Sequence, residues 1–515
     1  MAGFGDFLTY LDRLGGDLAA MAGADGRPML PSALIIETAD ILSVGQLRER
    51  MWLVFRDILR QAGRPEFRFD DVKVETLSVD SETTDDEFDR FFLVELDPVD
   101  QLADDVAHGR ALIELAEWLE LTIDWIVSAH ADLTLQLNEL RPTGPGTEML
   151  SGICSVGPIP LGDTSFKQDW WLHKIRHPEF FPCDGLPRGD FSGRGITIGH
   201  IDTGYGAHPE IETGSCIPGI GFDFILKRAG GWEPANSGAR SHGHGDSTAS
   251  VIISRTPHNM RGVATGAVTV PYRAIEFVAV FTGMGRVVKA IRMAAQSGHP
   301  VISMSLGGIS AFSGLEKQLS KAEAAGAICI AAAGNCVKLA VAPAISNYCI
   351  GVSGTAPNDA PWPYACSSPH GKLDIAAPAQ WVQAASHKTS RPDLLSERGE
   401  GTSYATAMTA GAAAVWLGYH GLQACRDAAD ASGVPLARYF KALLRQTARE
   451  PSNWSTDYGE GILDMCKLLK AGLPAIPPAV TQLVVKPPPP TARAMFNQFV
   501  RTARPDRADQ MLADE

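Results

Sequence analysis

Apolar and polar residues recur with two different periods along the first 150 positions of the chain. Apolar side chains recur at helical spacing over residues 47–60 and again over residues 111–127, which predicts two helices. Residues 72–79 alternate between apolar and polar positions, and residues 91–96 form a short apolar run, which predicts two strands. Residues 1–150 are therefore expected to form a small α/β domain.

A second and larger unit is expected over residues 170–470, because strand patterns alternate there with helical ones. This alternation is typical of a doubly wound parallel sheet with helices on both faces. Residues 151–169 follow a stretch rich in Pro and Gly and predict a linker. Residues 471–515 contain four consecutive prolines at 487–490, which predicts a stiff spacer followed by a polar tail.

The charge of the 515-residue chain is concentrated in its first third. The sequence has 59 acidic and 45 basic residues, and the first 150 positions hold 30 of the acidic but only 12 of the basic ones. A protein that binds nucleic acid normally presents a basic surface, so nucleic acid is not expected as the main partner. Two interpretations remain open: the acidic segment meets a mildly basic remainder within the chain, or it is a solvated surface.

Features that the sequence lacks predict a cytoplasmic protein without a metal or a cofactor. The start, Met1–Asp6, has neither the basic nor the apolar part of a secretory signal, and no apolar run is long enough to span a membrane. The nine cysteines are scattered without metal-binding spacing, as expected of free thiols in a reducing compartment.

Three widely separated residues carry the candidate chemistry. Asp202 lies in the apolar strand pattern at 195–204, and functional groups gather at strand ends in open parallel sheets. His244 stands at the opening of a predicted helix, and Ser403 stands at the start of a helix built largely from Ala, Gly and Thr. Each residue alone is compatible with an ordinary turn, surface or capping role. His242 competes with His244 but lies outside the helical stretch.

Taken together, the order Asp202, His244 and Ser403 resembles that of the subtilisin-like serine proteases, the subtilases of the peptidase S8 type. Further segments resemble motifs of this family at the expected places. They are Gly221–Phe224, Gly262–Ala267, Ser303–Gly308, Ala331–Asn335, Asp374–Pro378 and Tyr458–Gly461. The resemblance covers residues 170–466 and implies a subtilisin-like α/β fold for the larger unit.

The resemblance implies a serine endopeptidase, and the chemistry of the three side chains agrees with it. Serine is a weak nucleophile unless a base removes its proton, and this role falls to His244. Asp202 is expected to orient the imidazole and to stabilise its cationic form. The side-chain amide of Asn335 is expected to donate a hydrogen bond to the oxyanion that forms during the reaction.

The expected substrate is a polypeptide. Ser305, Leu306 and Gly307 resemble the substrate-binding edge of the family, which pairs with an extended peptide as an added strand. Ala333 and Gly334 precede the oxyanion asparagine and are expected to contact the substrate as well. The apolar side chain at position 306 favours uncharged substrate residues, but the substrate itself cannot be identified from the sequence.

The sequence departs from the family pattern at three places. Asp246 replaces the usual threonine two residues after the histidine and is expected to affect the pKa of His244 or the preferred charge of the substrate. Ala407 replaces the usual proline four residues after the serine. The stretch at 256–261 is short and carries one amide, so the calcium site of the family is not predicted.

The acidic domain at residues 1–150 has the position and size of the pro-segment that many relatives carry. A regulatory or partner-binding domain that stays attached is equally compatible with the sequence. We expect this domain to restrain the peptidase until a partner or a cleavage releases it. Two other functions remain open: a catalytically idle scaffold that binds peptides or a partner protein, and a different acyl hydrolase with the same triad.

Overall fold

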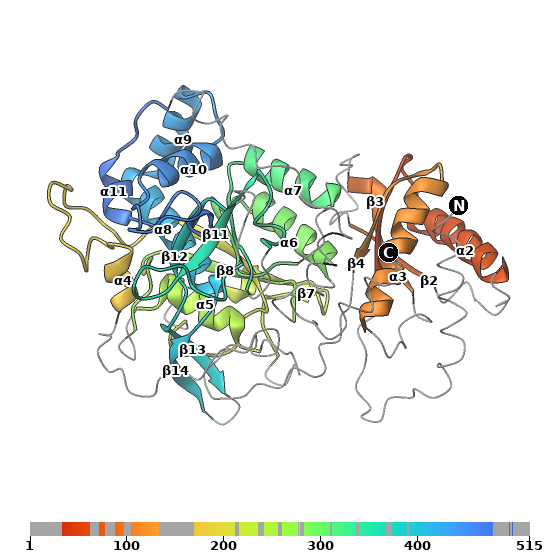
Figure 1. The fold of residues 1–515 in the computed structure, drawn as a ribbon, viewed down its shortest axis with the longest axis horizontal. Helices are drawn as coiled ribbons and strands as arrows, with labels where there is room; N and C mark the ends of the chain where they lie inside the picture. Colours follow the sequence, from red (N-terminus) through yellow and green to blue (C-terminus); the bar gives the residue numbers. More distant parts are fainter. Residues whose placement is uncertain are drawn as a thin grey trace.

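The computed structural model of the protein contains two units, which lie next to each other in Figure 1. The structure describes residues 33–61, 72–77, 88–96, 105–132, 169–211, 216–234, 242–255, 260–276, 278, 283–308, 312–335, 339–366, 373–388, 391–476, 494 and 497. The smaller unit has a four-stranded sheet, and the larger unit has an eight-stranded sheet and a two-stranded ribbon.

The smaller unit is an antiparallel sheet covered by two of its own helices. Its main elements are β1 (Ala33–Thr38), α2 (Val44–Gln61), β2 (Val72–Thr76), β3 (Phe91–Leu96), α3 (Asp105–Thr122) and β4 (Ile126–Asp132). The strands lie in the order β2-β3-β1-β4, and every neighbouring pair is antiparallel. In Figure 1, α2 and α3 lie on the side of the sheet that faces away from the larger unit.

Three predicted elements of this unit are confirmed. The helix expected at 47–60 lies within α2, and the strand expected at 91–96 is β3. The strand expected at 72–79 begins as predicted, and β2 ends at Thr76. Most of the acidic stretch between β2 and β3 lies outside the described residues.

The helix expected at 111–127 is wrong at its end. The helix α3 ends at Thr122, and the chain enters β4 at Ile126. The sequence also gave no prediction for β1. Both errors have one cause, because a short apolar run in a buried strand cannot be told from a buried helical segment by periodicity.

The larger unit is built on a mostly parallel sheet in the order β12-β11-β10-β9-β5-β8-β6-β7. Its strands are β5 (Thr197–Asp202), β6 (Phe222–Asp223), β7 (Arg228–Ala229), β8 (Val268–Arg273), β9 (Val301–Met304), β10 (Ile328–Ala332), β11 (Cys349–Thr355) and β12 (Ile375–Pro378). Neighbouring strands are parallel except β6 and β7. The ribbon pairs β13 (Val382–Lys388) with β14 (Arg391–Gly399).

Helices cover both faces of this sheet, which confirms the predicted doubly wound architecture. The α-helices of this unit are α4 (Trp170–Lys174), α5 (His244–Ile253), α6 (Met284–Gln296), α7 (Ser313–Ala324), α8 (Thr402–His420), α9 (Leu422–Ala431), α10 (Leu436–Gln446) and α11 (Met465–Lys470). In β9, Ile302 and Met304 join the apolar cluster of α6 and α7, whereas Val301 joins that of α5 and α8. Successive strand residues point to opposite faces, so these two helix pairs cover opposite faces of the sheet.

The smaller unit docks on the larger one through the face of its sheet that its own helices leave open. This face meets α6 and α7 (Figure 1). A Cβ atom on Gly285 of α6 would lie 3.0 Å from Leu77, and one on Gly314 of α7 would lie 3.1 Å from Phe91. The two glycines therefore allow the sheet to approach both helices closely.

Two carboxylates of the smaller unit bind the first turns of these helices. Asp132 of β4 accepts hydrogen bonds from the N–H groups of Gly283 (3.0 Å) and Met284 (3.4 Å) at the start of α6. Glu37 of β1 accepts a hydrogen bond from the hydroxyl of Ser313, the first residue of α7, at 2.9 Å, and it pairs with the ammonium group of Lys317 at 2.6 Å. Negative charge is favourable at a helix N-terminus, so both contacts stabilise the docked arrangement.

A third acidic residue adds to this complementarity. Glu75 of β2 forms ion pairs with Lys227 and Lys289 of the larger unit. The pKa of Glu37 and that of Glu75 both lie below the ordinary value, because their lysine partners outweigh the effect of burial. Of the two interpretations of the acidic first third, these contacts favour the one in which it meets basic groups of the same chain.

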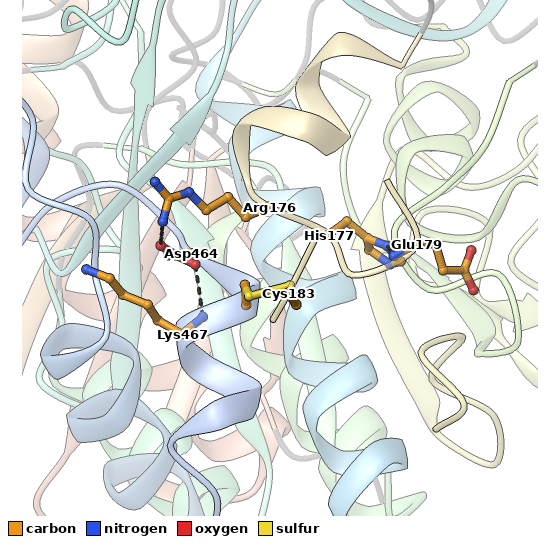
Figure 2. Close-up of a disulfide and its surroundings, with 7 residues drawn as sticks. Arg176, His177, Glu179, Cys183, Asp464 and Lys467 are labelled. Atoms are coloured by element: carbon orange, nitrogen blue, oxygen red, sulfur yellow. Dashed lines mark hydrogen bonds and ion pairs between the residues drawn. A yellow bond between two sulfur atoms is a disulfide. The ribbon is translucent and has the colours of Figure 1, made fainter. Parts of the chain in front are cut away.

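A disulfide joins Cys183 and Cys466, which are 283 positions apart in the sequence and have Cα atoms 5.7 Å apart. Figure 2 shows it near the ion pair of Arg176 and Asp464, whose charged atoms lie 2.9 Å apart. The prediction of free thiols is therefore wrong for these two cysteines. Scattered cysteines give no pairing signal, because only the fold brings the two positions together. Their use no longer favours a reducing compartment.

Replacing Cys183 and Cys466 together by serine is expected to lower the free energy of unfolding by about 2–4 kcal/mol. The reason is that the disulfide restricts the unfolded chain by closing a long loop. Urea unfolding followed by tryptophan fluorescence measures the change. Each single variant should lose about as much as the double variant, because either one breaks the bond. Independent, additive losses would contradict this account.

Several predictions fall outside the part of the chain that the structure describes. Residues 151–168 and nearly all of 477–515 are not described, so the linker, the spacer and the tail stay predictions. Among the described helices, none is both long and apolar enough to cross a bilayer. The cytoplasmic location also stays a prediction.

Candidate active site

Three neighbouring strands bring the predicted site together. In the sheet, β10, β9 and β5 lie side by side and parallel, so their carboxyl ends meet at one edge. Asp202 ends β5, Ser305–Gly307 follow β9, and Ala333–Asn335 follow β10. His244 and Ser403 lie in the first turns of α5 and α8, which pack against each other.

Asp202 and His244 are in direct contact. The Nδ1 atom of His244 lies 2.7 Å from Oδ1 of Asp202, and both residues are buried. The same oxygen accepts a hydrogen bond from the N–H group of Thr203 at 2.7 Å. Burial raises the pKa of Asp202, but the charge of His244 and its hydrogen bond outweigh burial, so this pKa lies below its ordinary value. Asp202 is therefore ionised and holds one nitrogen of the ring.

This contact requires a close approach between the turn after β5 and the first turn of α5. A Cβ atom on Gly245 would overlap the carbonyl oxygen of Gly204, so a larger residue could not be accommodated there. Gly204 itself has a φ of 93°, a left-handed conformation that favours glycine. The hydroxyl of Thr203 accepts a hydrogen bond from the N–H group of Gly245 at 3.0 Å. The glycines after Asp202 and His244 thus permit the contact.

Two side chains beside Asp202 were not singled out from the sequence. The hydroxyl of Thr248 lies 3.4 Å from Oδ2 of Asp202 and 3.1 Å from Nε2 of His200. Burial lowers the pKa of His200 to about 4, so this ring is neutral at neutral pH. The one available signal was spacing, since Thr248 follows His244 by four residues and lies on the same helix face.

Ser403 is the second residue of α8 and is 3% exposed. Its Oγ donates a hydrogen bond to the carbonyl oxygen of Ser305 at 3.3 Å, and Oγ of Ser305 donates to the carbonyl oxygen of Ser403 at 3.0 Å. These reciprocal bonds fix the start of α8 to the segment after β9. Ala407, where the family has proline, is fully buried within the same helix.

Asn335 is held by Thr402, the residue before the serine. Its Oδ1 accepts hydrogen bonds from the N–H group and the hydroxyl of Thr402, both at 2.9 Å. A backbone N–H group can only donate, so the oxygen of the amide must face Thr402 and the amide nitrogen points elsewhere. Thr402 was not predicted as part of the site, and nothing in the sequence distinguishes it from an ordinary helix start.

The substrate-binding segments predicted from the sequence are already paired within the chain. The N–H group of Gly307, which was expected to bind a peptide, donates to the carbonyl oxygen of Val278 at 3.1 Å. Gly308 exchanges two hydrogen bonds with Ala342, each 2.9 Å long. The side chain of Leu306 is buried in the apolar cluster of α6 and α7, so its apolar character serves the core.

Val341 lies between two of the predicted substrate-binding residues. A Cβ atom on Gly307 would overlap its Cγ2 methyl group, and one on Gly334 would lie 3.0 Å from the same methyl group. The sulfur of Cys366 lies 2.9 Å from that position on Gly334. The N–H group of Val341 donates to the carbonyl oxygen of Ala333 at 3.0 Å, so its backbone is fixed to the same segment.

Asp246, one of the departures from the family pattern, has a structural role of its own. Asp246 is fully buried, and its two oxygens accept the N–H group of Gly206, each at 3.0 Å.

His242 pairs with Glu233 at 3.0 Å, whereas His244 contacts Asp202, which agrees with the preference for His244. The absence of a calcium site at 256–261 stays a prediction, because part of that stretch is not described.

Comparison with known proteins identifies a family and relatives of this chain. The sequence pattern of the subtilase family matches residues 193–461. Thermitase from Thermoactinomyces vulgaris is 30% identical over 289 residues, which cover 54% of this chain and 90% of thermitase. Subtilisin DY from Bacillus licheniformis is 30% identical over 246 residues, which cover 46% of this chain and 81% of that protein. A solved protease structure from Pseudoalteromonas arctica aligns with a TM-score of 0.48 at 21% identity, over 60% of this chain and 98% of that one.

The matched region spans more than half of the chain. It contains the parallel sheet from β5 to β12 and the helices α5 and α8. The match therefore falls on the elements whose strand ends and helix starts carry the predicted site. The chain belongs to the subtilase family and is a subtilisin-like serine endopeptidase.

Proposed function

We propose that the chain hydrolyses peptide bonds with a triad of Asp202, His244 and Ser403. The observation that carries this proposal is the 2.7 Å contact between Nδ1 of His244 and the ionised carboxylate of Asp202. With Nδ1 held in this way, Nε2 on the other edge of the ring is the nitrogen that acts on the serine. Covalent labelling of Ser403 by a fluorophosphonate tests the proposal.

In the first step, Oγ of Ser403 attacks the carbonyl carbon of the substrate while Nε2 of His244 takes its proton. Asp202 stabilises the resulting imidazolium and keeps the ring in the required tautomer. His244 then delivers the proton to the leaving amine, which departs and leaves an acyl-enzyme. A water molecule then attacks the acyl-enzyme while His244 takes its proton. His244 delivers this proton to Oγ of Ser403, and the second product is released.

Asn335 supplies the donor for the oxyanion of the tetrahedral intermediate. The support for this role is that Thr402 binds its Oδ1, which directs the amide nitrogen away from α8 and fixes the whole side chain. A donor that is already oriented costs no reorganisation when the charge develops. Because Asn335 is anchored on the residue before Ser403, donor and nucleophile keep a fixed relation.

Asn335→Ala is expected to lower kcat by about 10²–10³ with little change in KM. This is the range found when one oxyanion donor is removed, including in a subtilisin. Steady-state kinetics on a peptide substrate measure both constants. Asn358→Ala is the matched control, because this amide is exposed and bonds the N–H group of Ala360. An unchanged kcat for Asn335→Ala would remove it from the proposed machinery.

The enzyme is expected to cleave after small residues such as Gly, Ala and Ser. We expect the residue that presents its carbonyl to Ser403 and Asn335 to place its side chain near Gly307 and Gly334, in the predicted substrate-binding segments. The methyl groups of Val341 lie beside both glycines. Val341→Ala is expected to raise kcat/KM for a larger residue, such as Leu, by about 10–100-fold relative to Ala, since each methylene group accounts for up to about 200-fold in such pockets. Cleavage-site profiling of a peptide library measures the preference, and unchanged profiles would contradict it.

We further propose that the N-terminal domain restrains the peptidase, in line with the expectation from the sequence. Its sheet is docked on α6 and α7, and the chain reaches α7 directly after the predicted substrate-binding edge at 305–308. The N–H group of Gly307 is bonded to Val278, in the connection that leads to α6. A peptide must replace this bond before it can pair with Gly307, so both observations support a restrained state.

A further inference from the structure

Glu233 is a buried acidic residue close to the triad that the sequence did not single out. It is 5% exposed and lies in the connection between β7 and α5. Its Oε2 accepts hydrogen bonds from the N–H group of Gly243 at 2.9 Å and from the hydroxyl of Thr203 at 3.3 Å. Its Oε1 lies 3.0 Å from Nδ1 of His242. One carboxylate therefore has partners on two separate segments of the chain.

These two segments are the ones that carry the aspartate and the histidine of the triad. Thr203 directly follows Asp202, and Gly243 directly precedes His244. The hydroxyl of Thr203 also accepts the N–H group of Gly245 at 3.0 Å. Glu233 and Thr203 thus join the turn after β5 to the first turn of α5 on both sides of His244.

The backbone of Glu233 is fixed as well. Its N–H group donates to the carbonyl oxygen of Tyr205 at 2.8 Å, and the N–H group of Tyr205 donates to that of Gly231 at 3.0 Å. The carboxylate is therefore attached to the turn after β5 through main chain and side chain alike. A rigid support of this kind is needed where a catalytic contact must be held within a fraction of an ångström.

Asp246 and Arg273 act on His242, the partner of Glu233. The hydrogen bond that His242 donates to Glu233 raises the pKa of His242 above its ordinary value, in spite of burial, and the charge of Asp246 acts in the same direction. The guanidinium of Arg273 opposes this shift of His242 and donates to the carbonyl oxygen of Thr203 at 3.2 Å. The raised pKa of His242 favours its cationic form, which complements the carboxyl group of Glu233.

We propose that Glu233 is a positioning residue of the triad, whose carboxylate fixes the start of α5 against Thr203 and thereby sets the contact between His244 and Asp202. The proposal rests on the proposed assignment of Asp202 and His244. Glu233 does not touch the substrate in this account. It acts through the two hydrogen bonds to Gly243 and Thr203, so what matters is an acceptor oxygen at this position.

Three variants of the full-length chain test the proposal. Glu233→Ala removes the acceptor and is expected to lower kcat about 10–100-fold with KM changed less than about threefold, because misplacement by about 1 Å can cost 10² in rate. Glu233→Gln keeps an acceptor oxygen and should restore most of kcat. Glu323→Ala is the matched control, since Glu323 is equally buried at 5% exposure and pairs with Arg438 in α10. It should keep full kcat at temperatures where it is folded.

A spectroscopic measurement separates this proposal from the triad proposal. The proton on Nδ1 of His244, in its short bond to Asp202, gives a far-downfield proton NMR resonance that needs no turnover. We expect Glu233→Ala to shift or broaden this resonance and Glu323→Ala to leave it in place. If the wild type is neither active nor labelled at Ser403, the triad proposal fails, and this resonance still decides the role of Glu233.

Two results would overturn the positioning role. One is a Glu233→Ala variant with unchanged kcat and an unchanged resonance. The other is a Glu233→Gln variant as impaired as Glu233→Ala, since its amide oxygen can still accept the same bonds. If Glu233→Ala does not fold, Thr203→Val carries the test, because it removes the hydroxyl between Glu233 and Gly245 without changing the size of the side chain. It should lower kcat about 3–10-fold, and an unchanged kcat would count against the proposal.

Discussion

Ser403→Ala will lower kcat for peptide hydrolysis by about 10⁶, if the triad proposal is correct, because it removes the atom that forms the covalent intermediate. This is the scale at which a subtilisin loses activity without its serine nucleophile. Within the part of the chain that the structure describes, Oγ of Ser403 makes one hydrogen bond, to the carbonyl oxygen of Ser305, so the fold should tolerate its loss. Steady-state hydrolysis of a peptide substrate and fluorophosphonate labelling measure the effect.

The matched control for this variant is Ser432→Ala. This serine is buried like Ser403, and its hydroxyl bonds the carbonyl oxygen of Ala428 at 2.9 Å, at the end of α9. It should keep both activity and labelling. Equal labelling of wild type and Ser403→Ala would contradict the triad. A wild type that stays inert after release of the N-terminal domain would support the idle scaffold, and turnover of esters alone would support another acyl hydrolase.

Replacing Glu37 and Asp132 together by alanine will raise the peptidase activity. The increase will be about 10²–10⁴-fold if the docked domain blocks this activity completely. Each carboxylate makes charge-assisted bonds to α6 or α7, and such bonds contribute about 1.5–3 kcal/mol each. The two residues are four register positions apart on adjacent strands, roughly 13 Å. Their contributions should therefore add. Initial rates with a peptide substrate, compared with the unchanged chain, measure the release.

A control within the same domain distinguishes release from general destabilisation. Asp57 lies on the exposed side of α2, and its carboxylate bonds the neighbouring Arg56. Asp57→Ala should leave the activity as it is. If the double variant of Glu37 and Asp132 is folded and no more active than the wild type, the N-terminal domain does not restrain the enzyme.

The sequence distinguishes the candidate residues of the site but not the side chains that support them. Asp202, His244, Ser403 and Asn335 stand in short motifs whose order and neighbours are distinctive. Their supports are single Thr, His and Glu residues in positions without any pattern, and their partners are chosen by the tertiary fold. Glu233 is an example, since it lies 10 positions from Gly243 and 30 from Thr203 and yet binds both.

The smaller domain was harder to predict because its sheet is covered on both faces. All six residues of β1, Ala33–Thr38, are buried, so the strand shows no alternation of apolar and polar positions. A strand of this kind has the composition of any buried segment. The helix predicted through Val127 failed because apolar positions continue from α3 into β4, and a short run of this kind does not distinguish a helix from a strand. The docking partner that covers the second face is remote in the sequence.

The docked sheet also has a consequence for the handling of this enzyme. Leu77 and Phe91 lie directly over Gly285 and Gly314, and one continuous apolar cluster includes residues of both domains. When the domain undocks, the apolar surface that it covered on α6 and α7 is exposed to water. Large uncovered apolar patches promote adhesion and self-association. On the proposed restraint, the form with the domain released should therefore bind more strongly to hydrophobic resins and precipitate at lower concentration, and its solubility would report activation.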